Sequence, residues 1–169
     1  MKIRRQLREA VLKSLYATEV SDDMIENIIR YTLKPLVNNI IKSVGDDKKK
    51  IDFKDKEAIE FAEKLYLRTI NSEKELDLEI NKHVENWDIN RLAVIDKLIL
   101  RMAICEMIEF DDIPAKVTIN EAIEIAKKYS TAKSGRFVNG ILDSAYQQLK
   151  ESGKIKKSGR GLIDETLNN

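Results

Sequence analysis

The sequence predicts an all-α fold of about seven helices, and three observations support this prediction. Apolar residues recur with helical periodicity through most of the chain. Only 2 prolines and 6 glycines interrupt its 169 residues, so long regular segments meet few breakers. With 43% hydrophobic and 35% charged residues, the chain has the composition of a globular protein with a core of its own. The periodicity is compatible with two small bundles that share one core.

Three helices are expected in the first half of the chain. The first spans residues 3–20. The second opens at a Ser21-Asp22-Asp23 cap and continues towards residue 41, with a kink or a break near Lys34 because Pro35 lies inside the pattern. The third spans about residues 53–71. The inward faces of the first and third helices are expected to be Leu7, Ala10, Val11 and Ser14, and Ala58, Phe61, Ala62 and Leu65, respectively.

Four further helices are expected in the second half. Capping-box patterns at residues 72–75 and 118–121 predict two helix starts, and the first of these helices should end near residue 86. Residues 89–110 are apolar almost all round, which predicts a central helix surrounded by others. Ser134 is expected to cap the last helix. Gly140 within that helix is expected to mark a close approach of another helix, because glycine lowers helix stability.

We interpret residues 1–151 as one helical domain, with an N-terminal bundle over residues 1–72 and a C-terminal bundle over residues 73–151. Residues 152–169 are rich in glycine and charge, which predicts a polar, flexible tail. No stretch is apolar for long enough to span a membrane, and the first residues lack the apolar core of a signal peptide. We therefore expect a cytoplasmic protein that makes no membrane contact.

Residues for catalysis are scarce. His83 is the only histidine, so a histidine-rich metal site is excluded. Cys105 lies in the apolar central helix, where a core role is more common than a nucleophilic one. No glycine-rich phosphate loop occurs. We expect no enzyme activity, no cofactor and no metal.

Nucleic-acid binding must come from local clusters of charge, because the net charge is only +1. On a helical wheel, Arg5 and Tyr16 share one face of the first helix. The turn before the last helix holds Lys133 and Arg136, followed at once by Phe137. Cations beside an aromatic ring suit single-stranded nucleic acid, since the charges bind phosphates and the ring stacks on a base.

A purely structural role for both rings remains an alternative. Tyr16 could pair with Leu12 in a second apolar ridge against another helix. Phe137, in the first turn of its helix, could equally be buried in the core.

Three blocks of sequence resemble the NusB family of transcription antitermination factors. They are R-R-Q-L-R-E-A-V-L-K-S-L-Y at the start, I-L-R-M-A-I-C-E-M in the central helix, and I-N-E-A-I-E-I-A-K followed by F-V-N-G-I-L-D. The likeness covers residues 4–149, although residues 24–86 match only in helical pattern. It implies two three-helix bundles packed crosswise and no catalytic activity.

The resemblance also implies a function. Family members bind the boxA element of ribosomal RNA leader transcripts together with NusE, a small-subunit ribosomal protein, in an antitermination complex with RNA polymerase. The usual arginine run is thinned in this chain by Gln6 and Leu7, while Lys133 and Arg136 stand in a turn that is usually more acidic. The residues expected to bind RNA are Lys2, Arg4, Arg5, Arg8, Tyr16, Lys133, Arg136 and Phe137.

The partner surface is expected in the acidic stretch after residue 71. Glu75 and Glu79 are the residues expected to attract a basic ribosomal protein there. Two alternatives remain open: a protein-interaction module without direct RNA contact, and an RNA-binding domain related to those appended to ribosomal RNA methyltransferases. The sequence also leaves a homodimer open.

Overall fold

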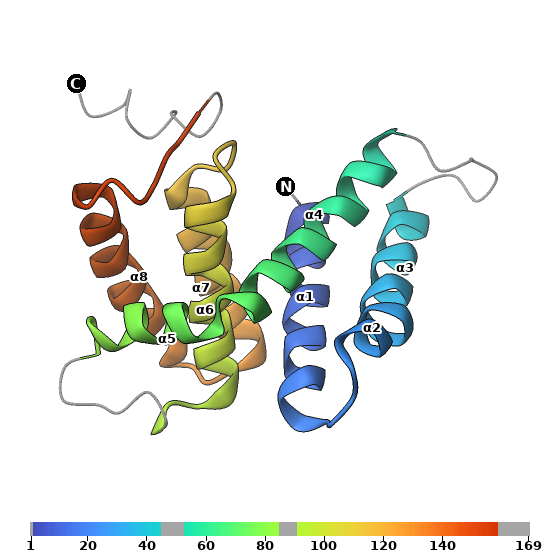
Figure 1. Cartoon of the computed structure of the whole chain (residues 1–169), viewed down its shortest axis with the longest axis horizontal. Coiled ribbons are helices and arrows are strands. Elements are labelled where there is room, and N and C mark those ends of the chain that lie inside the picture. Colours follow the sequence, from blue (N-terminus) through green and yellow to red (C-terminus); the bar gives the residue numbers. More distant parts are fainter. Residues whose placement is uncertain (1, 45–52, 85–90, 159–169) are drawn as a thin grey trace. The chain divides into compact units, whose positions relative to one another are not determined.

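The computed structural model describes the chain except residues 1, 45–52, 85–90 and 159–169 (Figure 1). All regular elements in the described residues are helices, which confirms the all-α prediction. Contacts divide the chain into two compact units, Met1–Ile70 and Asn71–Asn169. The elements are α1 (Lys2–Val20), α2 (Ile25–Ile28), the π-helical η1 (Ile29–Leu33), α3 (Lys34–Val44), α4 (Phe53–Asn71), α5 (Glu73–Asn81), α6 (Val94–Glu109), α7 (Ala115–Tyr129) and α8 (Ser134–Glu151). Because α2, η1 and α3 follow one another without a gap, these elements form seven separate helical rods within the described residues.

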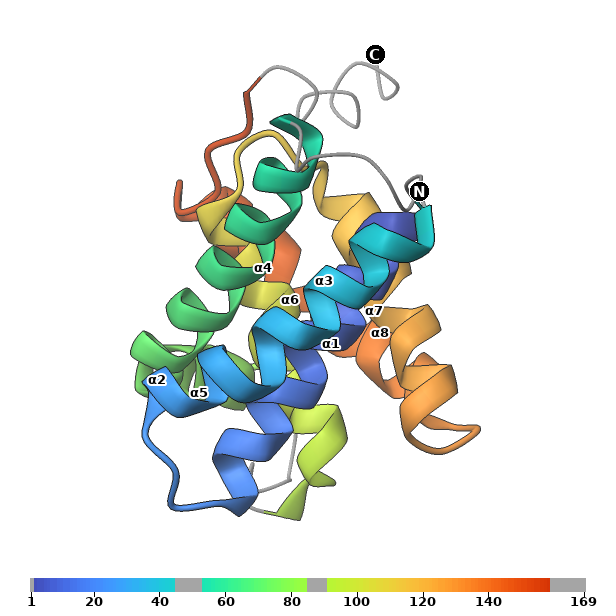
Figure 2. The same cartoon turned by 90° about the vertical axis from the view of Figure 1, so that its right-hand side faces the viewer.

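In the first unit, α1 packs along η1 and α3 (Figures 1 and 2). The predicted inward faces of α1 and α4 are confirmed, because all eight of their side chains are buried. A 2.7 Å hydrogen bond between the hydroxyl groups of Thr18 and Tyr66 joins α1 to α4. Burial raises the pKa of the Tyr66 phenol above its ordinary value, although the hydrogen bond from Thr18 acts in the opposite direction.

Pro35 does not break the second helical rod. Proline has no N–H to donate to the carbonyl group of residue 31, so a regular α-helix would lose one hydrogen bond there. The structure instead widens into the π-helical segment η1 immediately before Lys34, and α3 continues the helix through Pro35. Of the two predicted alternatives, a kink or a break near Lys34, the break is wrong, and a π-helical segment lies at this point.

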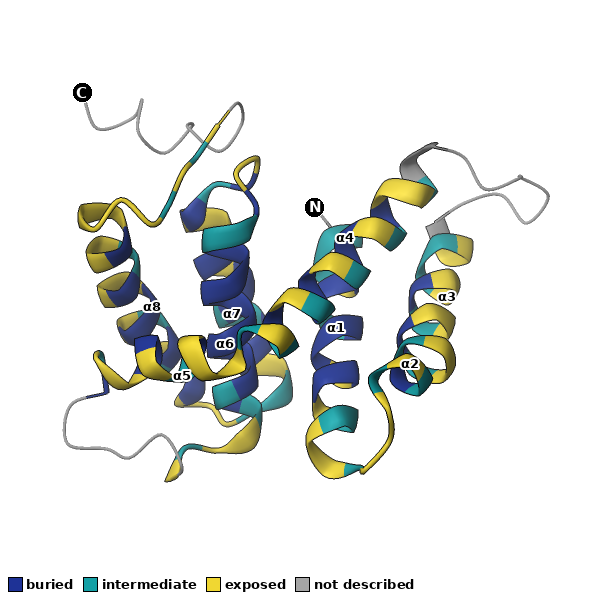
Figure 3. Ribbon diagram, viewed as in Figure 1, coloured by how far each residue is buried: buried dark blue, intermediate teal, exposed yellow. Residues whose placement is uncertain are grey.

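In the second unit, α6, α7 and α8 pack against one another, and the short α5 packs on α6 and α8. Residues of α6 are buried along most of its length, as the dark blue ribbon in Figure 3 shows. This confirms the prediction of a central helix that others surround, although the helix begins at Val94 rather than at residue 89.

Several predicted details of these helices are wrong. Helix α5 ends at Asn81 rather than near residue 86. Helix α7 begins at Ala115, directly after Pro114, so Thr118 lies inside the helix and does not cap it. Its buried hydroxyl group instead donates a 2.6 Å hydrogen bond to Glu106 Oε1 of α6. Ser72 does precede α5 as predicted, but its side chain makes no capping hydrogen bond.

A further correction concerns the glycines of α8. A Cβ atom at Gly140 would meet nothing within 4 Å among the described residues, so the predicted close helix approach does not occur there. It occurs at Gly135, where a Cβ atom would lie 3.0 Å from Lys127 Cγ of α7. The first turn of α8 therefore packs tightly against the last turn of α7.

The first residues after α8 turn back onto the second unit. Gly153 has a φ of 68°, which glycine adopts without steric cost, and the amides of Gly153 and Lys154 bond back to the last turn of α8. Lys157 Nζ then donates a 2.9 Å hydrogen bond to the carbonyl group of Phe110, just beyond α6. The described part of the tail is thus attached to the end of the central helix.

Candidate nucleic-acid interface

The arginines of α1 differ in how much they present to solvent. The guanidinium groups of Arg4 and Arg8 lie 5.0 Å and 5.5 Å from the centroid of the Phe61 ring of α4, within the range of cation–π contacts. Arg8 is only 3% exposed, so its charge faces the interior of the unit. Arg5 is half-buried. The backbone of Lys2 belongs to α1, whereas its side chain lies outside the described residues.

Tyr16 presents its ring at the surface of α1. The side chain is 43% exposed, whereas Leu12, one turn earlier, is buried. The two residues therefore do not form the buried ridge that was the structural alternative. Lys13, three residues before Tyr16, is exposed and lies on a neighbouring part of the helix surface.

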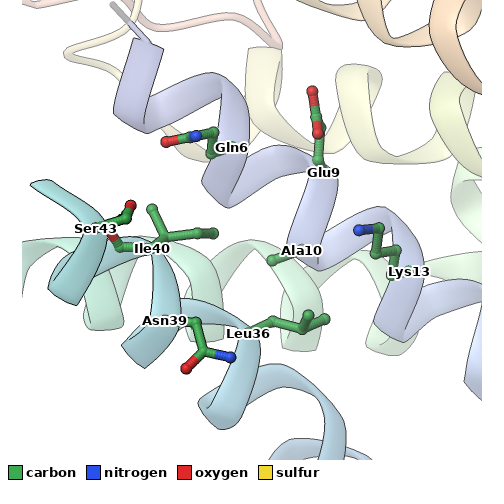
Figure 4. Close-up of a pocket in the computed structure, with 8 residues that line it drawn as sticks. All are labelled: Gln6, Glu9, Ala10, Lys13, Leu36, Asn39, Ile40 and Ser43. Atoms are coloured by element: carbon green, nitrogen blue, oxygen red, sulfur yellow. The ribbon is translucent and has the colours of Figure 1, made fainter.

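A groove between α1 and α3 adjoins this surface (Figure 4). Its volume is about 280 Å³. Leu36 and Ile40 point from α3 toward α1, and the exposed Gln6, Lys13 and Asn39 supply polar groups at its edges. The groove therefore runs along α1 from Gln6 to Lys13, the residue beside Tyr16.

The second cluster lies at the junction of α7 and α8. Lys133 and Arg136 are exposed, and Phe137 is half-buried. Lys133 and Phe137 line one groove of about 330 Å³, together with Arg91 and Asp96. The structure thus brings a ring and cations together at this corner, as the sequence predicted.

Ser134 is the first residue of α8 and not, as predicted, its cap, and its hydroxyl group fixes the local geometry of this corner. Its hydroxyl group lies 2.9 Å from Asp96 Oδ2, 2.9 Å from the hydroxyl group of Thr131 and 3.0 Å from that of Ser130. The backbone N–H of Thr131 also donates to Ser134 Oγ. This network ties the start of α8 to the first turn of α6.

Two groove residues, Arg91 and Asp96, were absent from the set of predicted site residues. Both come just before or at the start of the central helix, and the available signal was an acidic side chain directly after the apolar run of residues 92–95. The α1 cluster belongs to the first unit and the α7–α8 cluster to the second.

The two predicted partner residues differ sharply in exposure. Glu75 is exposed, whereas Glu79 is 5% exposed. Glu79 accepts a 2.8 Å hydrogen bond from Lys82 Nζ and lies 3.5 Å from both His83 Nε2 and Lys154 Nζ. Burial on its own would raise the pKa of Glu79, but the hydrogen bonds from Lys82 and His83 and the charges of Lys82 and Lys154 outweigh burial and lower the pKa. The expectation of an accessible docking carboxylate therefore holds only for Glu75.

Other kinds of site find little support in the described residues. Within them, no three His, Cys, Asp or Glu side chains gather closely enough to hold a metal ion. None of the helices described is both long and apolar enough to cross a membrane.

Comparisons with known proteins place these features in a family context. A profile described as the NusB family matches residues 5–147. The transcription antitermination protein NusB of Chloroherpeton thalassium is 45% identical over 161 residues, which cover 95% of this chain and 69% of that protein. The protein of the same name from Salinibacter ruber is 40% identical over 163 residues, which cover 96% of this chain and 92% of that protein.

Solved structures show the same likeness. T. maritima NusB superposes with a TM-score of 0.70 at 36% identity, covering 89% of this chain and 95% of that chain. A complex of the antitermination factors NusB and NusE with double-stranded RNA contains a chain that matches with a TM-score of 0.67 at 25% identity. That match covers 88% of this chain and 98% of the other.

Proposed function

The chain belongs to the NusB family, and on that premise we propose that it is an RNA-binding transcription antitermination factor. It binds single-stranded boxA-type leader RNA of ribosomal RNA transcripts together with NusE and suppresses termination within an RNA polymerase complex. The single observation that carries RNA binding is the α7–α8 corner, where Lys133 and Phe137 line one groove and Arg136 lies between them in sequence. The solved complex of NusB and NusE with double-stranded RNA supports RNA as the class of ligand and NusE as the partner.

The side chains divide the work of holding a single strand. Arg5, Lys133 and Arg136 attract phosphates, while Tyr16 and Phe137 provide rings on which unstacked bases can lie. Each stacked base is worth about 1–3 kcal/mol of binding free energy. Binding of this kind needs no cofactor and no catalytic residue.

Arg4 and Arg8 have a different role in this proposal. Since both guanidinium groups lie over Phe61 and Arg8 is buried, Arg8 acts through packing rather than by direct phosphate contact. Arg4, which is half-buried, can add to the positive potential at the start of α1.

The basic ribosomal partner is proposed to dock on the second unit. Exposed Glu75 of α5 supplies negative charge there, which would speed and orient association with a basic protein. An RNA strand that contacts both proteins would bind the pair more tightly than either one alone, by a coupling free energy of about 1–3 kcal/mol. The proposed place of action is the cytoplasm, where transcription complexes form in bacteria.

A protein-interaction module without RNA contact is the second candidate function. The burial of Arg8 and the net charge of +1 favour it, because both reduce the positive charge available to phosphates.

An RNA titration separates the two candidates. Labelled boxA-type RNA and a scrambled RNA are titrated with the full chain at one fixed salt concentration, with and without NusE. The proposal expects tighter binding of the boxA-type RNA than of the scrambled RNA, and a further gain when NusE is present. Binding of NusE with no measurable RNA binding by the chain or the pair would favour the second candidate.

A further inference from the structure

The groove at the α7–α8 corner contains a hydrogen-bond acceptor that phosphate binding and stacking leave unused. Asp96, in the first turn of α6, lines this groove and is 8% exposed. Its Oδ2 atom accepts a 2.9 Å hydrogen bond from Ser134. Its Oδ1 atom is buried and has no hydrogen-bond partner among the described residues. A buried carboxylate oxygen without a donor is unfavourable, so a ligand that supplies an N–H group would be stabilised here.

The other residues of the groove identify the class of ligand. The ring of Phe137 offers a stacking surface, and Arg91 and Lys133 offer charges for phosphates. A flat ligand with phosphates on one side and N–H donors on its edge matches this arrangement. A nucleotide of an RNA strand has these features.

Among the four bases, guanine fits an acceptor best. Its pairing edge places two donors side by side, N1–H and the N2 amino group, which a carboxylate can accept together. Adenine and cytosine each offer one amino donor beside an acceptor nitrogen, and uracil places its single N–H between two carbonyl groups. We propose that the groove is a guanine-selective subsite of the RNA interface, with Asp96 as the residue that reads the base. This inference rests on the proposed RNA-binding function.

A lysine or arginine of the partner protein would also satisfy Asp96 Oδ1. The groove disfavours that occupant, because Arg91 and Lys133 line the same space and would repel a third cation. Phosphates carried by an RNA strand would instead be attracted by both of these residues.

The test uses the full chain and short uridine-tract RNAs that differ in one central nucleotide. That nucleotide is uridine, guanosine or inosine, and inosine keeps N1–H but lacks the N2 amino group. The native chain should bind the guanosine RNA about 5- to 100-fold more tightly than the uridine RNA, with the inosine RNA in between. Equal affinity for guanosine and inosine RNA would overturn the proposal, and this comparison needs no variant.

Two variants then assign the preference to Asp96. Asp96→Asn keeps the shape of the side chain but replaces one acceptor by a donor, so it should remove the preference for guanosine while uridine RNA still binds. Phe137→Ala should weaken all three RNAs by a similar factor. If Asp96→Asn keeps the guanosine preference but weakens NusE binding, the groove holds a protein cation and the proposal is wrong.

The failure of this inference differs from the failure of the proposed function. If the chain binds none of the uridine-tract or boxA-type RNAs, RNA binding itself is wrong. If it binds all of them with equal affinity, only the guanine subsite is wrong. Thermal melts of both variants show whether a change in affinity reflects a change in folding.

Discussion

Asp77 of α5 holds the guanidinium group of Arg101 of α6 in a two-pronged contact, with Nε and Nη2 each 2.6 Å from a different carboxylate oxygen. Arg101 is buried in the central helix, so its charge needs a partner there. Glu73 adds a contact of 3.0 Å to the same guanidinium group. The acidic face of α5 thus serves first to attach this short helix to the central one.

Substitution of Asp77 should destabilise the second unit. Asp77→Ala leaves the buried guanidinium group with one carboxylate fewer, and the free energy of unfolding should fall by about 3 kcal/mol. Glu73→Ala is the matched control, because Glu73 is about half exposed and such pairs contribute about 0–1 kcal/mol. Urea unfolding of both variants measures the difference. Equal losses of unfolding free energy in the two variants would show that the Asp77 contact does not stabilise the unit more than the Glu73 contact does.

Substitutions at Thr118 and Ser72, the first residues of the two predicted capping boxes, should differ in their effect on stability. Thr118→Val removes the hydroxyl group bonded to buried Glu106 and should cost about 1–3 kcal/mol of stability. Ser72→Ala should cost only a few tenths of a kcal/mol, because Ser72 makes no capping hydrogen bond and surface substitutions rarely exceed about 0.5 kcal/mol. Thermal unfolding of the two variants decides. A larger loss at Ser72 than at Thr118 would restore the capping interpretation from the sequence.

Glu79 should make the stability of the chain depend on acid pH. Its pKa is lower in the folded state than its ordinary value of 4.5, so the unfolded chain binds the proton first as the pH falls. Its stabilising contribution is therefore complete above about pH 4.5 and is lost as the pH falls through the folded-state pKa. Glu79→Gln cannot ionise. The stability difference between native chain and variant, measured by urea unfolding, should be largest near neutral pH and shrink in acid.

The groups that contact Glu79 lower its pKa and so determine that stability falls in acid. Lys82, His83 and Lys154 are the cationic or ionisable groups that contact it. A stability difference that grows as the pH falls below 4.5 would mean that burial outweighs these contacts and that folding raises the pKa of Glu79 instead of lowering it.

The exposed ring of Tyr16 and the half-buried ring of Phe137 should affect RNA binding more than folding. Tyr16→Ala should weaken RNA binding by about 1–3 kcal/mol while leaving the melting temperature nearly unchanged, because the ring is 43% exposed. Phe61→Ala is the contrasting variant, since Phe61 is buried and its loss should cost about 3–5 kcal/mol of stability. The loss of stability in Phe137→Ala should lie between the losses in Tyr16→Ala and Phe61→Ala. A large loss of stability in Tyr16→Ala would favour a core role for that ring.

Much of the fold could be predicted from local pattern. Helical periodicity identified the seven rods and the inward faces of α1 and α4, because a side chain three or four residues away shares the same helix face. The pattern failed where a distant residue decides the outcome. The local pattern predicts that Thr118 caps a helix, but its hydroxyl group bonds to Glu106 of a neighbouring helix. The local pattern predicts that Glu79 is an exposed acid, but the chain after α8 returns and places Lys154 beside it.

The glycines of α8 illustrate the same limit. Periodicity shows that a glycine in a helix needs an explanation, but it does not show which glycine faces a neighbour. The close contact is at Gly135 against Lys127, and Gly140 faces open space among the described residues.

For the candidate site, the sequence predicted the residue types and the two clusters, because cations adjoin an aromatic residue in each one. It did not identify the groove beside Phe137. Arg91 and Asp96 lie just before and at the start of the central helix, and Lys133 lies in the turn before α8, so only the packing of α6 against α7 and α8 brings Lys133 to the other two. The burial of Arg8 could not be predicted from local pattern either, because it depends on contact with Phe61 of another helix.

We propose that Arg5, Lys133 and Arg136 bind phosphates of single-stranded RNA. The most direct measurement is the slope of log affinity against log salt concentration for boxA-type RNA, compared between the native chain and a variant carrying Arg5→Ala, Lys133→Ala and Arg136→Ala. Each lost phosphate contact on single-stranded RNA should reduce the magnitude of the slope by about 0.7, so the variant should lose about 2 in all. A control variant carrying Lys56→Ala and Lys150→Ala, which removes exposed cations outside both clusters, should keep the native slope. An unchanged slope in the triple variant would contradict the account.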